Sequence, residues 1–246
     1  MFFILAFALS WYPWIIALTR GRTSGPNPLG PFVAGIIVTA IVSGWACLRE
    51  FFGRILRWRV DAKWYAITFA TPILICLLAV GLVLPFIKTS PLSSFSIDNL
   101  REFPERLIFI FLFVGLGEEP GWRGFALPRL QIKHSPLIAS LILAPIWALW
   151  HLPLIGNEFP LPIVVPFVLS VFGGTFLLTW IFNRAEGSVL LTMFFHATLN
   201  AVGAGLIFPL FSGVPLIALW WIYGFVWLIA GFCALFLGTG NKQDAR

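Results

Sequence analysis

The sequence predicts an all-α, polytopic integral membrane protein with about eight transmembrane helices. Of its 246 residues, 59% are hydrophobic, and the mean hydropathy is +0.94. Only 11% are charged, whereas a soluble domain carries about 25%. The apolar residues gather into runs of about 20, the length that a helix needs to cross a bilayer. A chain of this length suits one integral membrane domain, residues 1–246, rather than two.

The predicted spans follow from these apolar runs. The first run begins Met1-Phe-Phe-Ile with no basic residue before it, which favours a membrane span over a cleaved signal peptide. Trp and Tyr cluster at several span ends, as they do at membrane–water interfaces. In chain order, the expected spans are residues 1–18, 31–48, 64–87, 104 to about 127, 136–155, 161–182, 188–210 and 214–238.

The basic residues predict the orientation. Eight spans place both termini on one side, which collects eleven basic residues against five on the other. Because cytoplasmic loops carry the excess of Lys and Arg, we expect both termini in the cytoplasm, with the plasma membrane as the location in a prokaryote. These loops also explain the net charge of +6, so we expect membrane lipids and no nucleic acid as partners. The eleven are Arg49, Arg54, Arg57, Arg59, Lys63, Arg123, Arg129, Lys133, Arg184, Lys242 and Arg246, and the five are Arg20, Arg22, Lys88, Arg101 and Arg106.

Two connections between spans stand out. Residues 49–63 mix basic and aromatic side chains, and between two spans this mixture predicts an interfacial segment in contact with anionic headgroups. The longest polar connection, residues 88–106, is expected to face outward on this topology.

An acidic pair, Glu118 and Glu119, lies within the fourth span. A charge at the bilayer centre costs roughly 2.5–3.5 kcal/mol on insertion scales, so these residues need a partner, a wet cavity or a function. Apolar residues resume as far as Leu127, which favours a long helix kinked at Pro120-Gly121. Glu119 and Arg123 are four apart, acid first, and should form a structural ion pair. Glu118 is turned about 140° from Arg123 and should face another helix.

Two histidines also lie within spans. His196 and Asn200 are four residues apart and share one helix face. His151 lies in the fifth span, one turn after Trp147, whose ring is placed to wall it. Intramembrane polar groups tend to face one another, so we expect these groups and the acidic pair to converge on one cavity.

The depth of His151 conflicts with this convergence. On straight helices it lies about 10 Å nearer the outer side than the other polar groups. We therefore expect Pro145 and Pro153 to bend the fifth span.

At these residues the sequence resembles the CPBP family, which comprises the CAAX prenyl endopeptidases and bacteriocin-processing intramembrane proteases. The family motifs EExxxR, FxxxH and HxxxN/D lie on three core helices in this order. Here they read Glu118 to Arg123, Trp147 to His151 and His196 to Asn200, within a protease core of about 104–210. Trp147 stands where the family usually has Phe, and it keeps an aromatic wall.

The resemblance implies an intramembrane endopeptidase with its active site in an intramembrane cavity, acting on a membrane-associated or prenylated protein or peptide. It implies that Glu118 is the catalytic carboxylate, which desolvation makes a better base for activating water. It assigns water orientation to His151 and oxyanion stabilisation to His196 and Asn200. The supporting residues are Glu119, Arg123 and Trp147.

A metal site and two other functions remain alternatives. The preferred mechanism needs no cofactor, but Glu118, His151 and His196 are also a plausible zinc set with water as the fourth ligand. The family has been described both as metalloproteases and as glutamic proteases. A proton-coupled transporter or a non-catalytic, immunity-type membrane protein is the alternative function. The substrate stays open between a prenylated CAAX tail, a bacteriocin leader and another membrane peptide.

Overall fold

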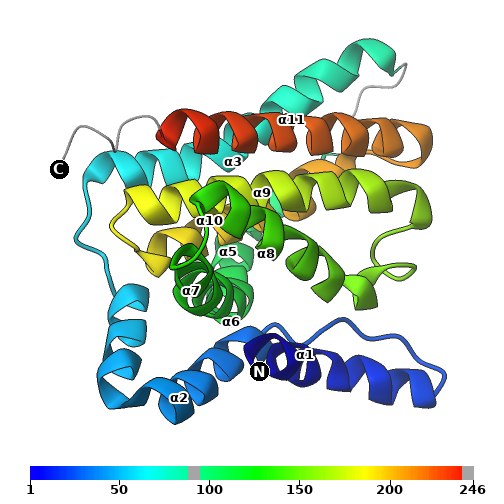
Figure 1. The fold of residues 1–246 in the computed structure, drawn as a ribbon. Helices are drawn as coiled ribbons and strands as arrows, with labels where there is room; N and C mark the ends of the chain where they lie inside the picture. The colour runs from blue at the N-terminus through cyan, green and yellow to red at the C-terminus, as the bar shows by residue number, and fades with distance from the viewer. Residues whose placement is uncertain (88–94, 240–246) are drawn as a thin grey trace.

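The computed structural model describes residues 1–87 and 95–239, which form helices and no β-strand, and the predicted all-α fold class is confirmed (Figure 1). Within these ranges seven helices are long and apolar enough to cross a membrane. Six of them, counted with their adjoining short turns, begin and end within about two residues of a predicted span, and the seventh, α2, ends later than predicted. Their α-helices are α1 (Phe2–Thr19), α2 (Gly30–Ile55), α3 (Ala62–Val83), α8 (Pro136–Trp150), α9 (Val164–Arg184), α10 (Val189–Val202) and α11 (Gly213–Thr239). Short turns extend α3 to Phe86, α8 to Leu154 and α10 to Leu210, and one begins the α9 span at Leu161.

The remaining predicted span is a composite helix that follows the short α4 (Ile97–Arg101). It contains two wide π-helical turns, and it continues to Gln131 rather than ending near Leu127. The second π turn begins at Pro120, which has no backbone N–H to donate to the helix. The predicted kink is therefore a widened turn, a feature that is frequent at functional sites. In order, the segments are α5 (Phe103–Ile110), η3 (Phe111–Gly115), α6 (Leu116–Glu119), η4 (Pro120–Ala126) and α7 (Leu127–Gln131).

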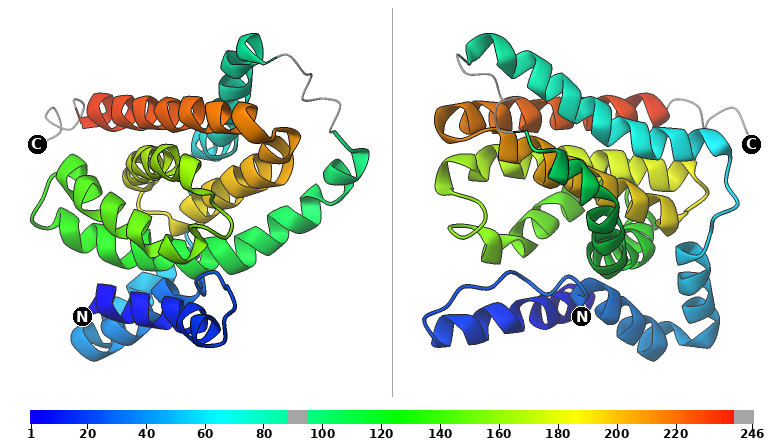
Figure 2. Two further views of the ribbon diagram at one scale, coloured as in Figure 1. Left: turned by 90° about the vertical axis from the view of Figure 1, so that its right-hand side faces the viewer. Right: turned by 180° about the vertical axis from the view of Figure 1, so that it is seen from behind.

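The helices form a layered bundle. Figures 1 and 2 show α3 and α11 along one flank, with α9 and α10 beneath them. The composite helix follows, and α1 and α2 pack together along the opposite flank. Trp11 on α1 also donates to the carbonyl of Trp150 at the end of α8, at 3.0 Å. The composite helix is thus enclosed between α10 and the α1–α2 pair.

The α2 helix differs from its prediction. It does not end at residue 48 but continues to Ile55, with a sharp break at Gly44, where φ is +75°. Such a left-handed φ is readily adopted by glycine. Part of the predicted interfacial loop 49–63 is therefore helical. After this helix, the Arg57 carbonyl accepts a hydrogen bond from Ser188 at 2.7 Å, which anchors the segment to the turn before α10.

Two glycines allow the chain before α2 to pack closely against the composite helix. A Cβ atom at Gly117 would lie 2.5 Å from the carbonyl oxygen of Pro28, and one at Gly121 would lie 2.5 Å from Pro31. Any larger residue would force the two backbones apart. We call this contact of residues 28–31 with the two glycines the glycine seat. It covers the helical turn that carries the acidic pair.

The structure corrects the count of loop cations. Arg123 is completely buried in the bundle and is not a loop residue, which leaves ten of the eleven on the expected cytoplasmic side. Arg106 lies within α5 and lines a cavity rather than belonging to the outer connection. Lys88, Lys242 and Arg246, which also entered the count, lie outside the described residues.

Candidate active site

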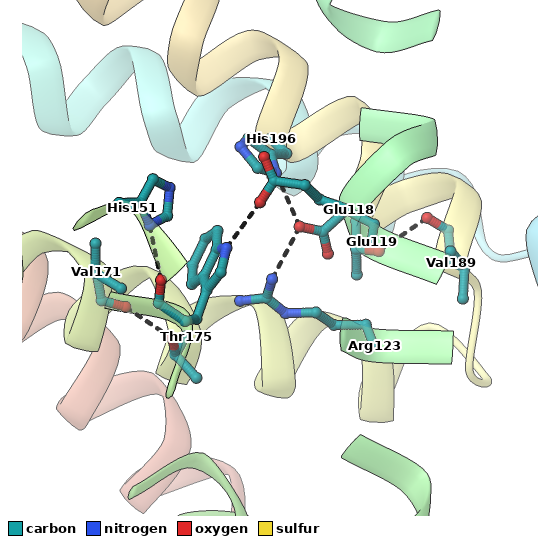
Figure 3. A network of polar contacts seen from close by, with 10 residues as sticks. Glu118, Glu119, Arg123, His151, Val171, Thr175, Val189 and His196 are labelled. Carbon is teal, nitrogen blue, oxygen red and sulfur yellow. Dashed lines mark hydrogen bonds and ion pairs between the residues drawn. The ribbon is translucent and has the colours of Figure 1, made fainter. Parts of the chain in front are cut away.

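Glu118 lies inside the bundle with 3% of its surface exposed. Its Oε2 atom accepts a hydrogen bond from the indole Nε1 of Trp147, at 2.8 Å. A buried carboxylate is costly without such a donor, so this bond offsets part of the cost of burial. Within the described part of the chain, Oε1 has no hydrogen-bond partner. Figure 3 shows the Glu118 side chain next to His196 and Glu119.

Glu119 forms a separate network with two cationic or polar partners (Figure 3). Its Oε1 atom lies 2.9 Å from Arg123 Nη1, so the predicted ion pair is present. The same oxygen lies 2.9 Å from Nδ1 of His196, a contact that the sequence did not predict. Arg123 also stacks over the Trp147 ring, with 4.1 Å between its guanidinium carbon and the ring centroid. Glu119 and Arg123 thus fix the ring of His196.

The hydrogen bond to Glu119 determines how His196 can act. Because a carboxylate accepts hydrogen bonds, Nδ1 of His196 must carry the proton in this contact. That leaves Nε2 as the nitrogen available to the cavity, which His196 lines. Nε2 donates a hydrogen bond only when the ring carries both protons.

His151 directly follows the end of α8 and precedes a short 3₁₀ turn, Leu152–Leu154, that contains Pro153. Despite the expected difference in depth, it lines the same cavity as Glu118 and His196. Its Nδ1 lies 2.7 Å from the carbonyl oxygen of Trp147. A carbonyl only accepts, so Nδ1 donates and Nε2 of the neutral ring keeps its lone pair. The ring packs against Trp147, Trp150 and Phe167, with centroids 5.0–5.5 Å apart.

A cavity of about 550 Å³ joins these side chains. Asn200, half-buried on α10, lines it together with the carboxylate of Glu118 and the two imidazoles. The cavity reaches the protein surface, because its lining includes the exposed Glu158 and the half-buried Arg106. Its charged, imidazole and amide lining residues are Arg106, Glu118, His151, Glu158, His196 and Asn200.

The possible zinc ligands are not arranged as a metal site. In the ranges that the structure describes, no three His, Cys, Asp or Glu side chains are grouped to hold a metal ion. Hydrogen bonds hold the Nδ1 atoms of His151 and His196 and one oxygen of Glu118. The Nε2 atoms and the second carboxylate oxygen remain, so these side chains keep atoms that could bind a metal after rearrangement.

Sequence reasoning missed the role of the Trp147 side chain. It was expected to wall His151, yet its N–H also binds Glu118 and its ring contacts Arg123 and His196. The Phe usual in the family has no such N–H. An indole four residues before an intramembrane histidine was the available signal, because a buried indole N–H usually finds an acceptor.

The fold and the cavity define a polytopic helical membrane protein with a buried carboxylate and two imidazoles inside its bundle. Residues 102–202 match the family model described as Type II CAAX prenyl endopeptidase Rce1-like. The chain is also 27% identical over 188 residues to a protein of Methanococcus maripaludis named CAAX prenyl protease 2. The alignment covers 71% of this chain and 69% of that protein. Together with the three motifs, these matches show that the chain is similar to the CPBP family of membrane proteases.

Proposed function

We propose that this chain is an intramembrane endopeptidase in which Glu118 activates the water that hydrolyses a peptide bond. One observation carries the proposal. Glu118, two imidazoles and Asn200 come from three separate helices and line one cavity within an otherwise apolar bundle. Intramembrane ionisable groups are costly, and such convergence supports a function rather than a packing role.

The hydrogen bonds divide the roles among the side chains. Trp147 holds Oε2 of Glu118, so Oε1 is the oxygen that takes a proton from water. His151 donates through Nδ1, and its Nε2 lone pair accepts the other water proton in a hydrogen bond that orients the attack. The water oxygen then bonds to the carbonyl carbon. The electron pair moves to the carbonyl oxygen, which becomes an oxyanion.

The oxyanion requires donors, and α10 supplies them. The amide of Asn200 donates in any protonation state, and Nε2 of His196 donates when the ring carries both protons. As the tetrahedral intermediate collapses, the carbon–nitrogen bond breaks. Glu118 passes its proton to the departing amine, which restores the carboxylate. Glu119 and Arg123 hold the His196 ring in place throughout.

For the substrate, we infer a prenylated peptide ending in a CAAX sequence. The names of the family model and of the Methanococcus relative carry this inference. The cavity supports it, because much of its wall is aliphatic or aromatic and suits an apolar peptide and lipid chain.

We also infer that both termini face the cytoplasm. Without Arg123 and Arg106, which are not loop residues, the basic residues favour that side by ten to four. Accessibility of single cysteines introduced into the 49–63 and 95–101 segments tests this, since the first should be labelled only from inside and the second only from outside.

The substitution Glu118→Gln tests the proposed reaction. It keeps the size of the side chain but removes the base, so cleavage of a prenylated CAAX peptide should fall by about 100-fold or more. Glu105→Gln is the matched control, because Glu105 lies exposed on the same composite helix. Activity of Glu118→Gln above a tenth of the wild-type value would contradict the mechanism. A transporter or immunity-type protein would show no Glu118-dependent cleavage at all.

A further inference from the structure

A stripe of cavity-lining residues connects the acid to a cation at the surface. Arg106, Ile110, Val114 and Glu118 follow one another at intervals of four on the composite helix, and all four line the cavity. Arg106 lies near the start of this helix, where its side chain is only half-buried. The part of the cavity that runs along this helix from Glu118 toward the surface therefore ends at the guanidinium group of Arg106. We call this part of the cavity the path.

The Arg106 guanidinium is held in place by α5 and by the turn after α10. Its Nη1 donates to the carbonyl of Gly205 at 2.7 Å, and its Nη2 pairs with Glu102 at 3.2 Å. A Cβ atom at position 205 would lie 2.8 Å from Arg106 Cδ and Nη1, so the glycine makes room for this side chain. A guanidinium has five N–H donors, and among residues 1–87 and 95–239 two of them find an acceptor. Three donors remain for a ligand.

The path between the two polar ends is apolar. On the composite helix it is lined by Ile110 and Val114, and on the α10 side by Leu199 and Ala204. Such a channel suits aliphatic side chains and offers little to charged ones. Only its two ends can interact strongly with polar groups of a substrate.

The length of this path can be compared with that of a peptide. Twelve residues separate Arg106 from Glu118, or about 18 Å along a helix at the usual rise. Three extended residues span about 10–11 Å. The side chains of Arg106 and Glu118 and the attacking water span the remaining distance of about 7 Å. A carboxylate about three residues beyond the cleaved bond would thus reach the guanidinium.

We propose that Arg106 binds the free α-carboxylate at the C-terminus of the substrate. This inference rests on the proposed function. A guanidinium binds a carboxylate through charge-assisted hydrogen bonds, often two in parallel. Glu158, the other charged residue at the rim, repels a carboxylate and confines it to the Arg106 side. Arg106 is a specificity residue and takes no part in the bond-breaking step.

The test compares two synthetic peptides with the full-length protein in detergent micelles. Both carry a farnesylated cysteine followed by three apolar residues, and one ends in a free carboxylate while the other ends in a carboxamide. The wild-type protein should favour the free acid by about tenfold or more in kcat/KM, chiefly through KM. Arg106→Gln should bring this ratio within twofold of one, because cleavage of the free acid should fall more than cleavage of the amide.

Two further variants keep the test decisive. Arg101→Gln removes a neighbouring arginine that pairs with Asp98 at 3.0 Å outside the cavity, and it should keep the wild-type ratio. Gly205→Ala keeps Arg106 but displaces its guanidinium, and it should lower the ratio. Thermal unfolding of each variant verifies that it is folded.

Each outcome decides the inference. Equal cleavage of both peptides by the wild-type protein overturns it, and the proposed function stands if that cleavage still requires Glu118. An unchanged ratio in Arg106→Gln also overturns it. An equal loss for both peptides shows that Arg106 only supports the fold. If the wild-type protein cleaves neither peptide, the proposed function fails and the inference fails with it.

Discussion

The two ends of the cavity handle charge in opposite ways. Behind the inner end, Glu119 and Arg123 are completely buried and pair with each other at 2.9 Å. At the outer end, Arg106 and Glu102 pair at 3.2 Å with 34% and 62% of their side chains exposed. A buried charge that loses its partner is strongly destabilising, whereas an exposed pair contributes little. The inner end should therefore govern folding and chemistry, and the outer end should govern the choice of substrate.

Removing the cation from the inner end should have the largest effect. Arg123→Met leaves Glu119 buried without its cation and, in the described part of the chain, with only His196 as a polar partner. The free energy of unfolding should therefore fall by about 3–5 kcal/mol. Denaturant titration in mixed micelles measures this change. Arg101→Gln, which breaks the exposed pair with Asp98, is the outer counterpart and should leave stability almost unaltered. A comparable loss of unfolding free energy in the two variants would contradict the proposed difference between the two ends of the cavity.

Removing one donor from Glu118 should have an intermediate effect. Trp147→Phe restores the residue usual in the family and keeps a ring, but it deletes the hydrogen bond to Oε2. A hydrogen bond to a charged group contributes about 1.5–3 kcal/mol, so kcat should fall about 10- to 100-fold with little change in KM. Steady-state kinetics with the prenylated peptide measures both constants.

Trp122→Phe is the matched control for this variant. Trp122 is completely buried on the composite helix that carries Glu118, and its indole nitrogen has no hydrogen-bond partner among the described residues. Both variants lose the same atoms from a buried ring, but only one loses a hydrogen bond. If Trp122→Phe slows turnover as much as Trp147→Phe does, packing rather than the indole N–H explains the result.

Chelation should have the smallest effect. In the proposed reaction the protons move between water, Glu118 and the leaving amine, so exhaustive treatment with a chelator should leave activity within about twofold. Metal analysis of the purified protein should accompany the assay. Loss of activity that zinc alone restores would instead assign Glu118, His151 and His196 to a metal centre.

The sequence predicted the helices well where long apolar runs defined them. Six of the predicted spans coincide closely with long helical spans, and a seventh extends further than predicted, since hydrocarbon allows few other backbone conformations. The break at Gly44 and the π turns of the composite helix were not predicted. A single glycine or proline does not specify whether a helix ends, bends or widens, because packing against neighbouring helices decides this.

The sequence was less informative about contacts between helices. The spacing of Glu119 and Arg123 predicted their ion pair, because both residues lie on one helix. The bond from His196 to Glu119 joins two helices whose relative rotation no local pattern reveals. The sequence also assigned Arg106 to an outer connection. Its orientation toward the cavity depends on the close approach of Gly205, a contact between distant segments that no local pattern reveals.

The glycine seat has a consequence for how the protein can be shortened or can diverge. The family match covers residues 102–202, yet part of the enclosure around the acidic pair is the backbone of residues 28–31. A fragment limited to the matched region would leave that helical turn open to acyl chains. Mutational tolerance should therefore be low at 28–31 and at the two glycines, even though none of these positions carries a reacting group.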